Sequence, residues 1–215
     1  MAGGIAVLDY GIGNLASAHK AFVHLGARAR LVTDPADAAG ADGVVLPGVG
    51  AFGRCAEALR ASGLDAVVAD VVASGTPFLG ICIAIQLLYT GSDESPGVPG
   101  LGVLDAMVRR LPDGVKHPQM QWNQLRHRPE RARAEPGGGL LAGVPDGAWV
   151  YFVHSYAPEP TAEVGATCDY GGDVVAAVER GPVWGTQFHP EKSGPVGLGI
   201  LANFVAACAR APASA

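Results

Sequence analysis

The sequence is poor in charged residues and has no closely spaced cysteines. Asp, Glu, Lys and Arg make up 16% of the 215 residues and hydrophobic residues 49%, which excludes an intrinsically disordered chain. A net charge of −5 argues against a general nucleic-acid or anionic-membrane surface. Cys55 and Cys82, the closest pair of its four cysteines, are 27 residues apart, so we expect neither a zinc site nor a disulfide scaffold.

Long apolar runs are also absent. No stretch approaches the roughly 20 apolar residues that span a bilayer. The first residues, "MAGGIAVLDYGIGN", lack the basic segment and apolar core of a signal peptide. We therefore expect a cytoplasmic protein that contacts no membrane. A single domain over residues 1–210 and a disordered tail over 211–215 are predicted.

The first half of the chain alternates short apolar runs with amphipathic ones. Strands are expected at 5–10, 29–32, 43–48 and 76–81, and helices at 15–25, 51–63 and 83–89. Asn14 is expected to cap the first helix and Gly26 to end it. Such alternation is typical of a parallel sheet covered by helices on both faces, with ligands at the carboxyl ends of its strands.

The pattern changes after residue 89. Strand-like runs joined by short polar or glycine-containing turns predict antiparallel pairing in the later part of the sheet. They cover residues 101–111, 119–125, 148–156, 162–170, 174–181 and 183–188, and a helix is expected at 198–210. The predicted fold class is α/β, with a mixed, mainly parallel sheet, helices on both faces and antiparallel additions in the C-terminal half.

Cys82 lies where a strand-like run turns into a helix-like run. Gly80 and Ala84 flank it with the spacing of a nucleophile elbow, in which small neighbours let strand and helix approach closely. On composition alone, a lone cysteine in an apolar run is more often inert core. Ala84 departs from the glycine that usually occupies its position.

A base for such a nucleophile is available in "QFHPEKS". His189 follows a predicted strand, and Glu191 lies two residues further on, where a carboxylate could hold the imidazole tautomer. Pro190 between them restricts the backbone. Taken alone, the tripeptide is a weak signal and is more often a loop of no catalytic role.

Together, "PGVGAF", "GICIAIQLLY" and "QFHPEKS" resemble the class I glutamine amidotransferases, in which a Cys-His-Glu triad splits glutamine into glutamate and ammonia. The resemblance implies a flavodoxin-like fold and no cofactor. It assigns Cys82 as nucleophile, His189 as general base and acid, and Glu191 as the residue that orients His189. It also implies an oxyanion hole formed by backbone N–H groups of Val49, Gly50 and Ile83.

Three further segments, "DYGIGN", "KHPQMQWN" and "YFVHSY", are similar to the glutaminase subunits of imidazole glycerol phosphate synthases. That similarity implies a role in histidine biosynthesis and a heterodimer with a (β/α)₈-barrel cyclase that consumes the ammonia. The glutamine-binding residues it implies are Gln86, Glu94, Ser155 and Tyr156. The residues it places at the cyclase interface are Asn14, Trp122 and Lys192.

Read without the resemblance, some of these residues have simpler interpretations. Gln86 is an exposed polar group on a helix, Glu94 belongs to a solvated acidic loop, and Trp122 is either core or an interface anchor. The chain also departs from the subunit pattern at Ala84, Ile85, Gln119 and Gln121. A glutamine in place of glycine at 121 would be strained if the backbone there had a positive φ.

Three alternatives therefore stay open beside the histidine-pathway subunit. One is a diverged paralogue that supplies ammonia to a related synthase in another pathway. Another is a non-catalytic partner subunit that has kept the fold. The last is a cysteine hydrolase of γ-glutamyl amides that works without a partner.

Overall fold

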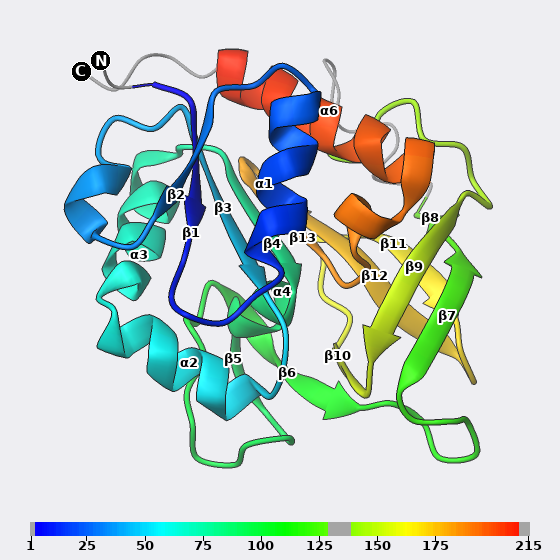
Figure 1. Ribbon diagram of the computed structural model, residues 1–215. Coiled ribbons are helices and arrows are strands. Elements are labelled where there is room, and N and C mark those ends of the chain that lie inside the picture. Colours follow the sequence, from blue (N-terminus) through cyan, green and yellow to red (C-terminus); the bar gives the residue numbers. More distant parts are fainter. Residues whose placement is uncertain (1–2, 129–138, 211–215) are drawn as a thin grey trace.

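The computed structural model describes residues 3–128 and 139–210 (Figure 1). The predicted disordered tail, 211–215, lies outside the described residues. The helices are α1 (Leu15–His24), α2 (Phe52–Ala61), α3 (Leu64–Ser74), α4 (Ile83–Leu87) and α6 (Gly194–Arg210), with the 3-10 turns η1 (Pro35–Ala38) and η2 (Pro190–Lys192). The strands are β1 (Ile5–Leu8), β2 (Ala29–Val32), β3 (Gly43–Gly48), β4 (Phe78–Cys82), β5 (Tyr89–Ser92), β6 (Leu104–Arg110), β7 (Gln119–Gln124), β8 (Arg126–His127), β9 (Trp149–His154), β10 (Tyr156–Pro158), β11 (Val164–Asp169), β12 (Asp173–Arg180) and β13 (Val183–Thr186).

The main sheet has eight strands in the order β2-β1-β3-β4-β13-β12-β11-β8. Strands β2, β1, β3, β4 and β13 pair in parallel, whereas β12, β11 and β8 continue the sheet antiparallel. The prediction of a mainly parallel sheet with antiparallel additions is therefore confirmed. Strand β13, from the end of the chain, lies between β4 and β12, so residues far apart in sequence meet at the sheet centre.

Helices cover both faces of this sheet because its strands are apolar on both sides. On one face, α1 and α6 pack together, with the rings of Phe22 and Phe204 6.0 Å apart. Val7 and Leu79 of the strands belong to that layer of the core. On the other face, α2, α3 and α4 pack over a second layer that includes Leu46.

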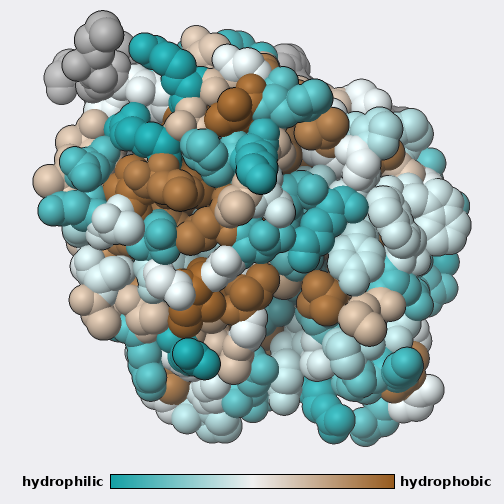
Figure 2. Space-filling model, in the orientation of Figure 1, coloured by the Kyte–Doolittle hydropathy of each residue, from teal (hydrophilic) through white to brown (hydrophobic). Residues whose placement is uncertain are grey.

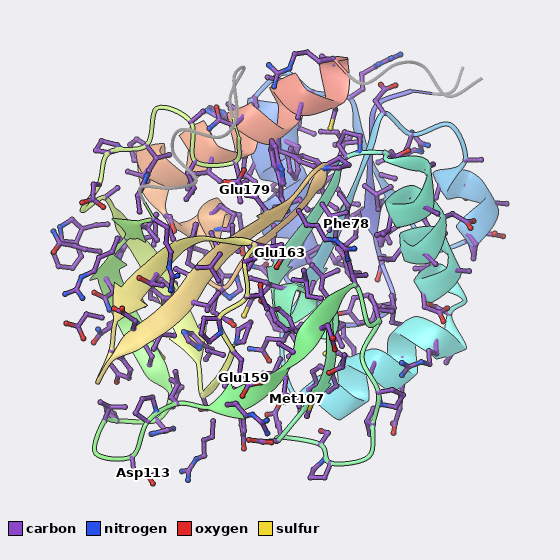
Figure 3. The ribbon with its side chains drawn as sticks, turned by 180° about the vertical axis from the view of Figure 1, so that it is seen from behind. Phe78, Met107, Asp113, Glu159, Glu163 and Glu179 are labelled. Carbon is purple, nitrogen blue, oxygen red and sulfur yellow. The ribbon has the colours of Figure 1, made fainter. Side chains whose placement is uncertain are left out.

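Two smaller sheets are attached to the main one. Strands β10, β6 and β5 form one, in which Glu159 accepts hydrogen bonds from the Met107 backbone N–H (3.0 Å) and the Arg109 Nε–H (2.9 Å). Glu159 and Met107 lie side by side when the molecule is seen from behind (Figure 3). Strands β7 and β9 form the other, an antiparallel ribbon. The sequence predicted β6, β7 and β9, but not β5 or β10, and not the separation of these strands from the main sheet.

Several local predictions need correction. Helix α3 was not predicted, and β5 begins within the run expected to be helical at 83–89. Asn14 is the N-cap residue of α1, but its side chain makes no capping hydrogen bond. Gly26 follows that helix with φ 77°, as expected for a left-handed C-terminal stop. Within residues 3–128 and 139–210, no helix is long and apolar enough to cross a membrane.

Candidate active site

Cys82 occupies a strained turn between β4 and α4. Its φ is 58°, and no other non-glycine residue in the described part of the chain has a positive φ. For a residue with a Cβ such a conformation costs energy, so the packing around it has to enforce it. Strand β4 is held on both sides, by β3 and by β13, which fixes the turn. The predicted nucleophile elbow is present in the backbone.

Two glycines on neighbouring strands make room for helix α4. Gly80 and Gly185 are register partners in β4 and β13. A Cβ on Gly80 would lie 3.0 Å from the Ala84 carbonyl carbon, and one on Gly185 would lie 2.7 Å from Ile85 Cγ1. The positions that require glycine are therefore the two on the strands, Gly80 and Gly185. Ala84, a residue of α4, is fully buried in the core, so the core accommodates its methyl group.

His189 and Glu191 form a buried pair beside Cys82. His189 Nδ1 lies 2.7 Å from Glu191 Oε1, and the exposed fractions of the two side chains are 1% and 2%. A carboxylate can only accept, so Nδ1 carries a proton and the ring is oriented by Glu191. Pro190 begins η2 immediately after His189 and turns the chain so that the carboxylate comes back to the ring.

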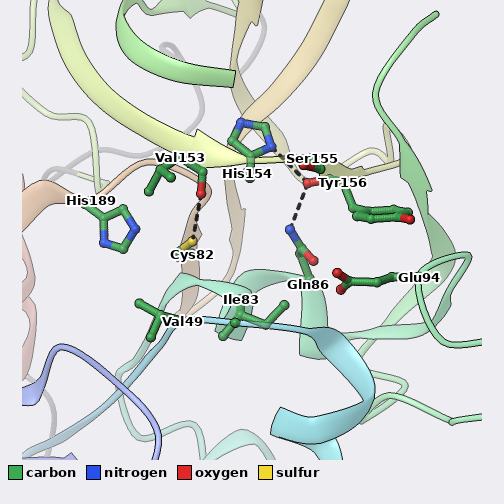
Figure 4. A pocket seen from close by; sticks show the side chains of 11 residues that line it. Val49, Cys82, Ile83, Gln86, Glu94, Val153, His154, Ser155, Tyr156 and His189 are labelled. Atoms are coloured by element: carbon green, nitrogen blue, oxygen red, sulfur yellow. Dashed lines mark hydrogen bonds between the residues drawn. The ribbon is translucent and has the colours of Figure 1, made fainter. Parts of the chain in front are cut away.

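Two carbonyl groups of strand β9 accept hydrogen bonds from His189 and Cys82. The His189 backbone N–H donates to the Tyr151 carbonyl (2.9 Å), and the Cys82 thiol donates to the Val153 carbonyl (3.9 Å). The second of these hydrogen bonds is drawn in Figure 4, where Cys82 lies between His189 on one side and Gln86 and Glu94 on the other.

His189 keeps its proton at neutral pH. Burial favours the neutral ring, but the interactions with Cys82 and with Glu191 outweigh it and raise the pKa of His189 to about 9. Its Nε2 has no partner with hydrogen-bond geometry among the described residues, although the ring interacts electrostatically with Cys82. Such contacts often tighten only when substrate is bound. An imidazolium beside a sulfur can stabilise a thiolate and later protonate a leaving amine.

The end of β3 lies against the start of α4, and two residues of the predicted oxyanion hole, Val49 and Gly50, follow it directly. Gly48 is the register partner of Cys82, and a Cβ there would overlap the Ile83 side chain. Gly50 has φ 99°, a conformation that favours glycine, and no atom lies within 4 Å of where its Cβ would be. The Val49 carbonyl accepts a hydrogen bond from Cys55 Sγ (3.3 Å), which fixes the peptide between Val49 and Gly50.

These residues enclose a pocket of about 270 Å³. Every residue predicted for the nucleophile, the oxyanion hole and glutamine binding lines it, as does His189. They are Val49, Gly50, Cys82, Ile83, Gln86, Glu94, Ser155, Tyr156 and His189. Glu191 lies behind His189, as expected for a residue that acts on the ring.

Gln86 is not the exposed helix residue that its position alone suggested. Only 3% of it is exposed, and its Nε2 donates to the Tyr156 carbonyl (2.8 Å) and to Gln187 Oε1 (3.0 Å). Its Oε1 is buried and has no hydrogen-bond partner among the residues that the structure describes. Glu94 accepts a hydrogen bond from the Phe52 backbone N–H (2.7 Å) at the first turn of α2, so it is held on the pocket wall and is not freely solvated.

His154, at the end of β9, is a buried histidine held by a hydrogen bond to the backbone. Its Nδ1 lies 2.9 Å from the Tyr156 carbonyl, which requires a proton on that nitrogen. Burial lowers the pKa of His154 to about 4, so the ring stays neutral next to the charged His189. Its hydrogen bond supports the same carbonyl that holds Gln86.

The residues expected at a partner interface lie around the outside of the pocket. Trp122 is 47% exposed, which excludes the core alternative, and its ring packs on Tyr151 of β9 at 6.1 Å. Gln121 lies in β7 opposite Phe152 with an extended backbone, so the strain considered for a glutamine there does not arise. Lys192 is exposed on η2, and Asn14 is partly buried at the start of α1, which packs against η2.

Sequence reasoning did not single out Gln187 and Gly185. Gln187 is fully buried and lies within reach of both Gln86 and Cys82. The alternation of Gln187, Phe188 and His189 along an extended segment was a usable signal, because it puts the glutamine on the same side as the histidine. Gly185 could be found only from its pairing with Gly80.

Known proteins resemble this chain along nearly its whole length. The family model for "Glutamine amidotransferase class-I" matches residues 6–208. The imidazole glycerol phosphate synthase subunit HisH of Synechococcus sp. (strain JA-3-3Ab) is 47% identical over 211 residues, covering 96% of this chain and 94% of that protein. The subunit of the same name from Symbiobacterium thermophilum is 48% identical over 202 residues, covering 93% and 92%.

A solved structure supports the fold independently. The crystal structure of a glutamine amidotransferase aligns with a TM-score of 0.73 over 95% of this chain and 98% of that one, at 22% identity. At that identity the likeness concerns the fold alone. The family-model match and the two HisH relatives extend the likeness to sequence, and so the chain belongs to the class I glutamine amidotransferases and, among them, to the HisH subunits of imidazole glycerol phosphate synthase.

Proposed function

We propose that this chain hydrolyses L-glutamine to glutamate and ammonia and delivers the ammonia to a cyclase subunit that forms imidazole glycerol phosphate in histidine biosynthesis. The observation that carries the proposal is the buried His189–Glu191 pair beside Cys82, with all three residues at one pocket. The names of the relatives, at 47% and 48% identity, support the histidine pathway as its setting. A cytoplasmic location is part of the proposal, in keeping with four buried free cysteines.

The reaction would proceed in two steps. The Cys82 thiolate attacks the side-chain carbonyl carbon of glutamine, and the resulting oxyanion is stabilised by backbone N–H groups near Gly50 and Ile83. The C–N bond breaks as protonated His189 gives its proton to the leaving nitrogen, which departs as ammonia. His189, now neutral, takes a proton from water, the hydroxide attacks the thioester, and glutamate leaves with Cys82 regenerated.

The pocket walls suit the substrate. Glu94 carries a negative charge at one end, where the ammonium group of glutamine would lie, and the unpartnered Gln86 Oε1 can accept an N–H of the substrate. Ser155 and Tyr156 would contact it mainly through their backbone groups. On the outside, Trp122, Lys192 and Asn14 would contact the (β/α)₈ cyclase in a heterodimer.

The geometry bears on the alternatives as well. The proximity of Cys82, His189 and Glu191 at one pocket favours a catalyst over a non-catalytic subunit. Trp122 is exposed, and its ring packs on Tyr151, whose carbonyl accepts the His189 backbone N–H. This connection favours a partner-dependent enzyme over a hydrolase that works alone. A paralogue serving a different synthase is less well supported, because the relatives carry the name of the histidine-pathway enzyme.

The test is glutamate release from glutamine by the purified chain, alone and with a histidine-pathway cyclase and its nucleotide ligand. We expect low activity alone, strong stimulation by the complex, and no activity in Cys82→Ala under either condition. Activity that survives in Cys82→Ala would refute the triad. A folded wild type that stays silent with the cyclase would refute the partner.

A further inference from the structure

A second buried amide lies next to the nucleophile, outside the pocket lining. Gln187 follows β13 directly, is fully buried, and is anchored by its backbone N–H, which donates to the Ala176 carbonyl (2.8 Å). The next residue, Phe188, packs on Phe152 with ring centroids 5.7 Å apart, in the core layer that also contains Cys82. Gln187 contacts the Cys82 sulfur through its Nε2, and the ring of His189 interacts with the same sulfur.

The hydrogen-bond network fixes which end of the Gln187 amide faces the sulfur. The Tyr156 carbonyl can only accept, so the group of Gln86 that points to it is Nε2. The second hydrogen on that nitrogen goes to Gln187 Oε1. The Gln187 Nε2 then faces Cys82 Sγ at 3.9 Å as a donor. The oxygen and nitrogen of a side-chain amide are hard to tell apart from their positions alone. Here the Tyr156 carbonyl, which can only accept, determines the orientation of the Gln86 amide and through it that of Gln187.

The two polar contacts of Cys82 Sγ differ in which form of the sulfur they favour. The Val153 carbonyl can accept from a thiol, whereas it repels a thiolate. Gln187 Nε2 donates, so its interaction becomes stronger when the sulfur is charged. Of these two neighbours, only Gln187 interacts more favourably with the Cys82 thiolate than with the thiol.

We propose that Gln187 is a positioning residue that favours the thiolate of Cys82 and holds Gln86 so that its free Oε1 faces the substrate. The inference rests on the proposed role of Cys82 as nucleophile and of Gln86 in glutamine binding. Gln187 links the two, because its Oε1 fixes Gln86 and its Nε2 contacts the sulfur. A substrate that moves the Gln86 side chain would therefore also move the Gln187 amide, which contacts the Cys82 sulfur.

Other titratable groups face the sulfur from the surrounding elements. His189 adjoins it after β13, Tyr10 after β1 and Cys55 from α2, while Glu94 and His154 line the same pocket. A substitution at Gln187 leaves all five in place. A change in the ionisation of Cys82 in such a variant can then be attributed to the lost amide.

The first experiment measures alkylation of Cys82 by iodoacetamide from pH 5 to 10, followed by mass spectrometry of its peptide in the full chain. In Gln187→Leu, we expect the rate at pH 7 to fall about 3- to 10-fold and the midpoint to move to higher pH, with an unchanged plateau at high pH. Gln119→Leu is the matched control, because Gln119 is an equally buried glutamine whose Nε2 contacts Cys168 Sγ (3.7 Å). In this variant, iodoacetamide should alkylate Cys82 at the wild-type rate.

Two further measurements keep the test decisive if Gln187→Leu does not fold. Gln187→Asn keeps an amide but is too short to reach the sulfur, so it should behave like Gln187→Leu. In wild type, the side-chain amide NMR signals of Gln187 should move with the pH midpoint of Cys82 alkylation, and those of Gln119 should not.

Steady-state kinetics in the cyclase complex test the link to Gln86. Gln187→Leu should lower kcat for glutamate release roughly 10-fold, and Gln86→Leu should mainly raise KM. The double variant should lose much less than the product of the two effects. Wild-type alkylation in a folded Gln187→Leu, with static amide signals, would overturn the proposal. Full activity in Cys82→Ala would instead remove the nucleophile role on which it rests.

Discussion

At the scale of single residues, the site depends on one unfavourable backbone conformation. Cys82, at φ 58°, holds a conformation that costs on the order of 1–3 kcal/mol for a residue with a Cβ. The pairing of β4 with two neighbours and the room left by Gly80 and Gly185 make this conformation the one compatible with the sheet. The sulfur is consequently presented at a fixed point above the strand ends.

Gly50 is expected to tolerate alanine in volume but not in backbone conformation. Its φ is 99°, and nothing lies within 4 Å of an added Cβ. Gly50→Ala should lower the free energy of unfolding by about 1 kcal/mol and partner-stimulated glutamate release by roughly 10- to 100-fold, as loss of an oxyanion donor does. Urea unfolding and a glutamate assay measure the two effects.

Gly102→Ala is the control for that variant. Gly102 also has a positive φ, 67°, and open space around its Cβ position, but it lies outside the pocket. It should show a similar loss of stability with full activity. Equal activity losses in the two variants would mean that Gly50 matters only through strain.

The His189–Glu191 pair should make stability depend on pH. The folded-state pKa of His189, about 9, is above its ordinary value of 6.5, so the stabilisation is complete below pH 6.5 and is lost as the pH rises through about 9. Glu191→Gln keeps an oxygen acceptor but removes the charge. The advantage of wild type over Glu191→Gln in unfolding free energy should shrink by on the order of 1–2 kcal/mol between pH 6.5 and 9. Denaturant unfolding at several pH values checks this, and a constant difference would contradict it.

The proximity of Cys82, His189 and Glu191 was predictable from sequence, because each residue lies in a short motif whose spacing reflects local geometry. The burial of Gln86 was not, since its partners Tyr156 and Gln187 are 70 and 101 residues away in the chain. Trp122 shows the same limit, because its exposure follows from the ribbon being separate from the main sheet. Contacts across long sequence separations leave no local pattern.

At the scale of elements, the position of the Glu191 carboxylate depends on how α6 packs against η2. Gly197 of α6 lies directly on the carbonyl of Pro190, so a Cβ there would overlap the carbonyl oxygen. Ser193 supports the same junction, since its Oγ donates to the His189 carbonyl (2.6 Å) and accepts from the Tyr151 N–H (3.0 Å). The helix start therefore sets the position of Glu191.

Gly197→Ala should push η2 away from α6 and move Glu191 relative to His189. We expect a loss of about 1–3 kcal/mol in unfolding free energy from overpacking, and lower glutamate release in the complex. Gly199→Ala is two residues further along the same helix, where no atom lies within 4 Å of the Cβ position. That variant should gain about 0.5–1 kcal/mol and keep its activity, measured by thermal unfolding and the same assay.

Most elements were predictable from periodicity, and the exceptions have identifiable causes. Helix α3 starts at Leu64 directly after Gly63, which has φ 73° and serves as its N-cap. The glycine that predicted the end of one helix thus also begins the next, with no intervening loop to separate them. Strand β5 starts at Tyr89, where an apolar run is compatible with either helix or strand.

At the scale of the whole molecule, the ribbon β7–β9 presents an aromatic surface next to the site. Met120, Trp122 and Trp149 are exposed on it, and the face over these strands has the pale colours of intermediate hydropathy in Figure 2. Trp122 reaches the site through Tyr151, whose carbonyl holds the His189 backbone. A partner that docks on this face would therefore contact the residues that position His189.

Trp122→Ala should leave the isolated chain as stable as wild type, because the side chain is half exposed. Its dissociation constant for the cyclase should rise roughly 10- to 30-fold, as for an aromatic interface anchor. Leu31→Ala is the matched control, with the same exposed fraction, 47%, on the far edge strand β2. Titrating the stimulation of glutamate release with cyclase compares the three proteins, and an unchanged Trp122→Ala would contradict the interface assignment.

The late arrival of β13 has a consequence for the nascent chain. Strand β4 ends at Cys82, but its neighbour on one side is not synthesised until residues 183–186 have been translated. Until then, β4 has an open edge with buried-type side chains such as Phe78 and Leu79, the kind of edge that invites aggregation. The same strand leads into Gln187, His189 and Glu191, so one late insertion both closes the sheet and completes the site. A ribosome-bound fragment that stops before β13 would contain Cys82 without His189 and Glu191, so we expect it to release no glutamate from glutamine until the fold is complete.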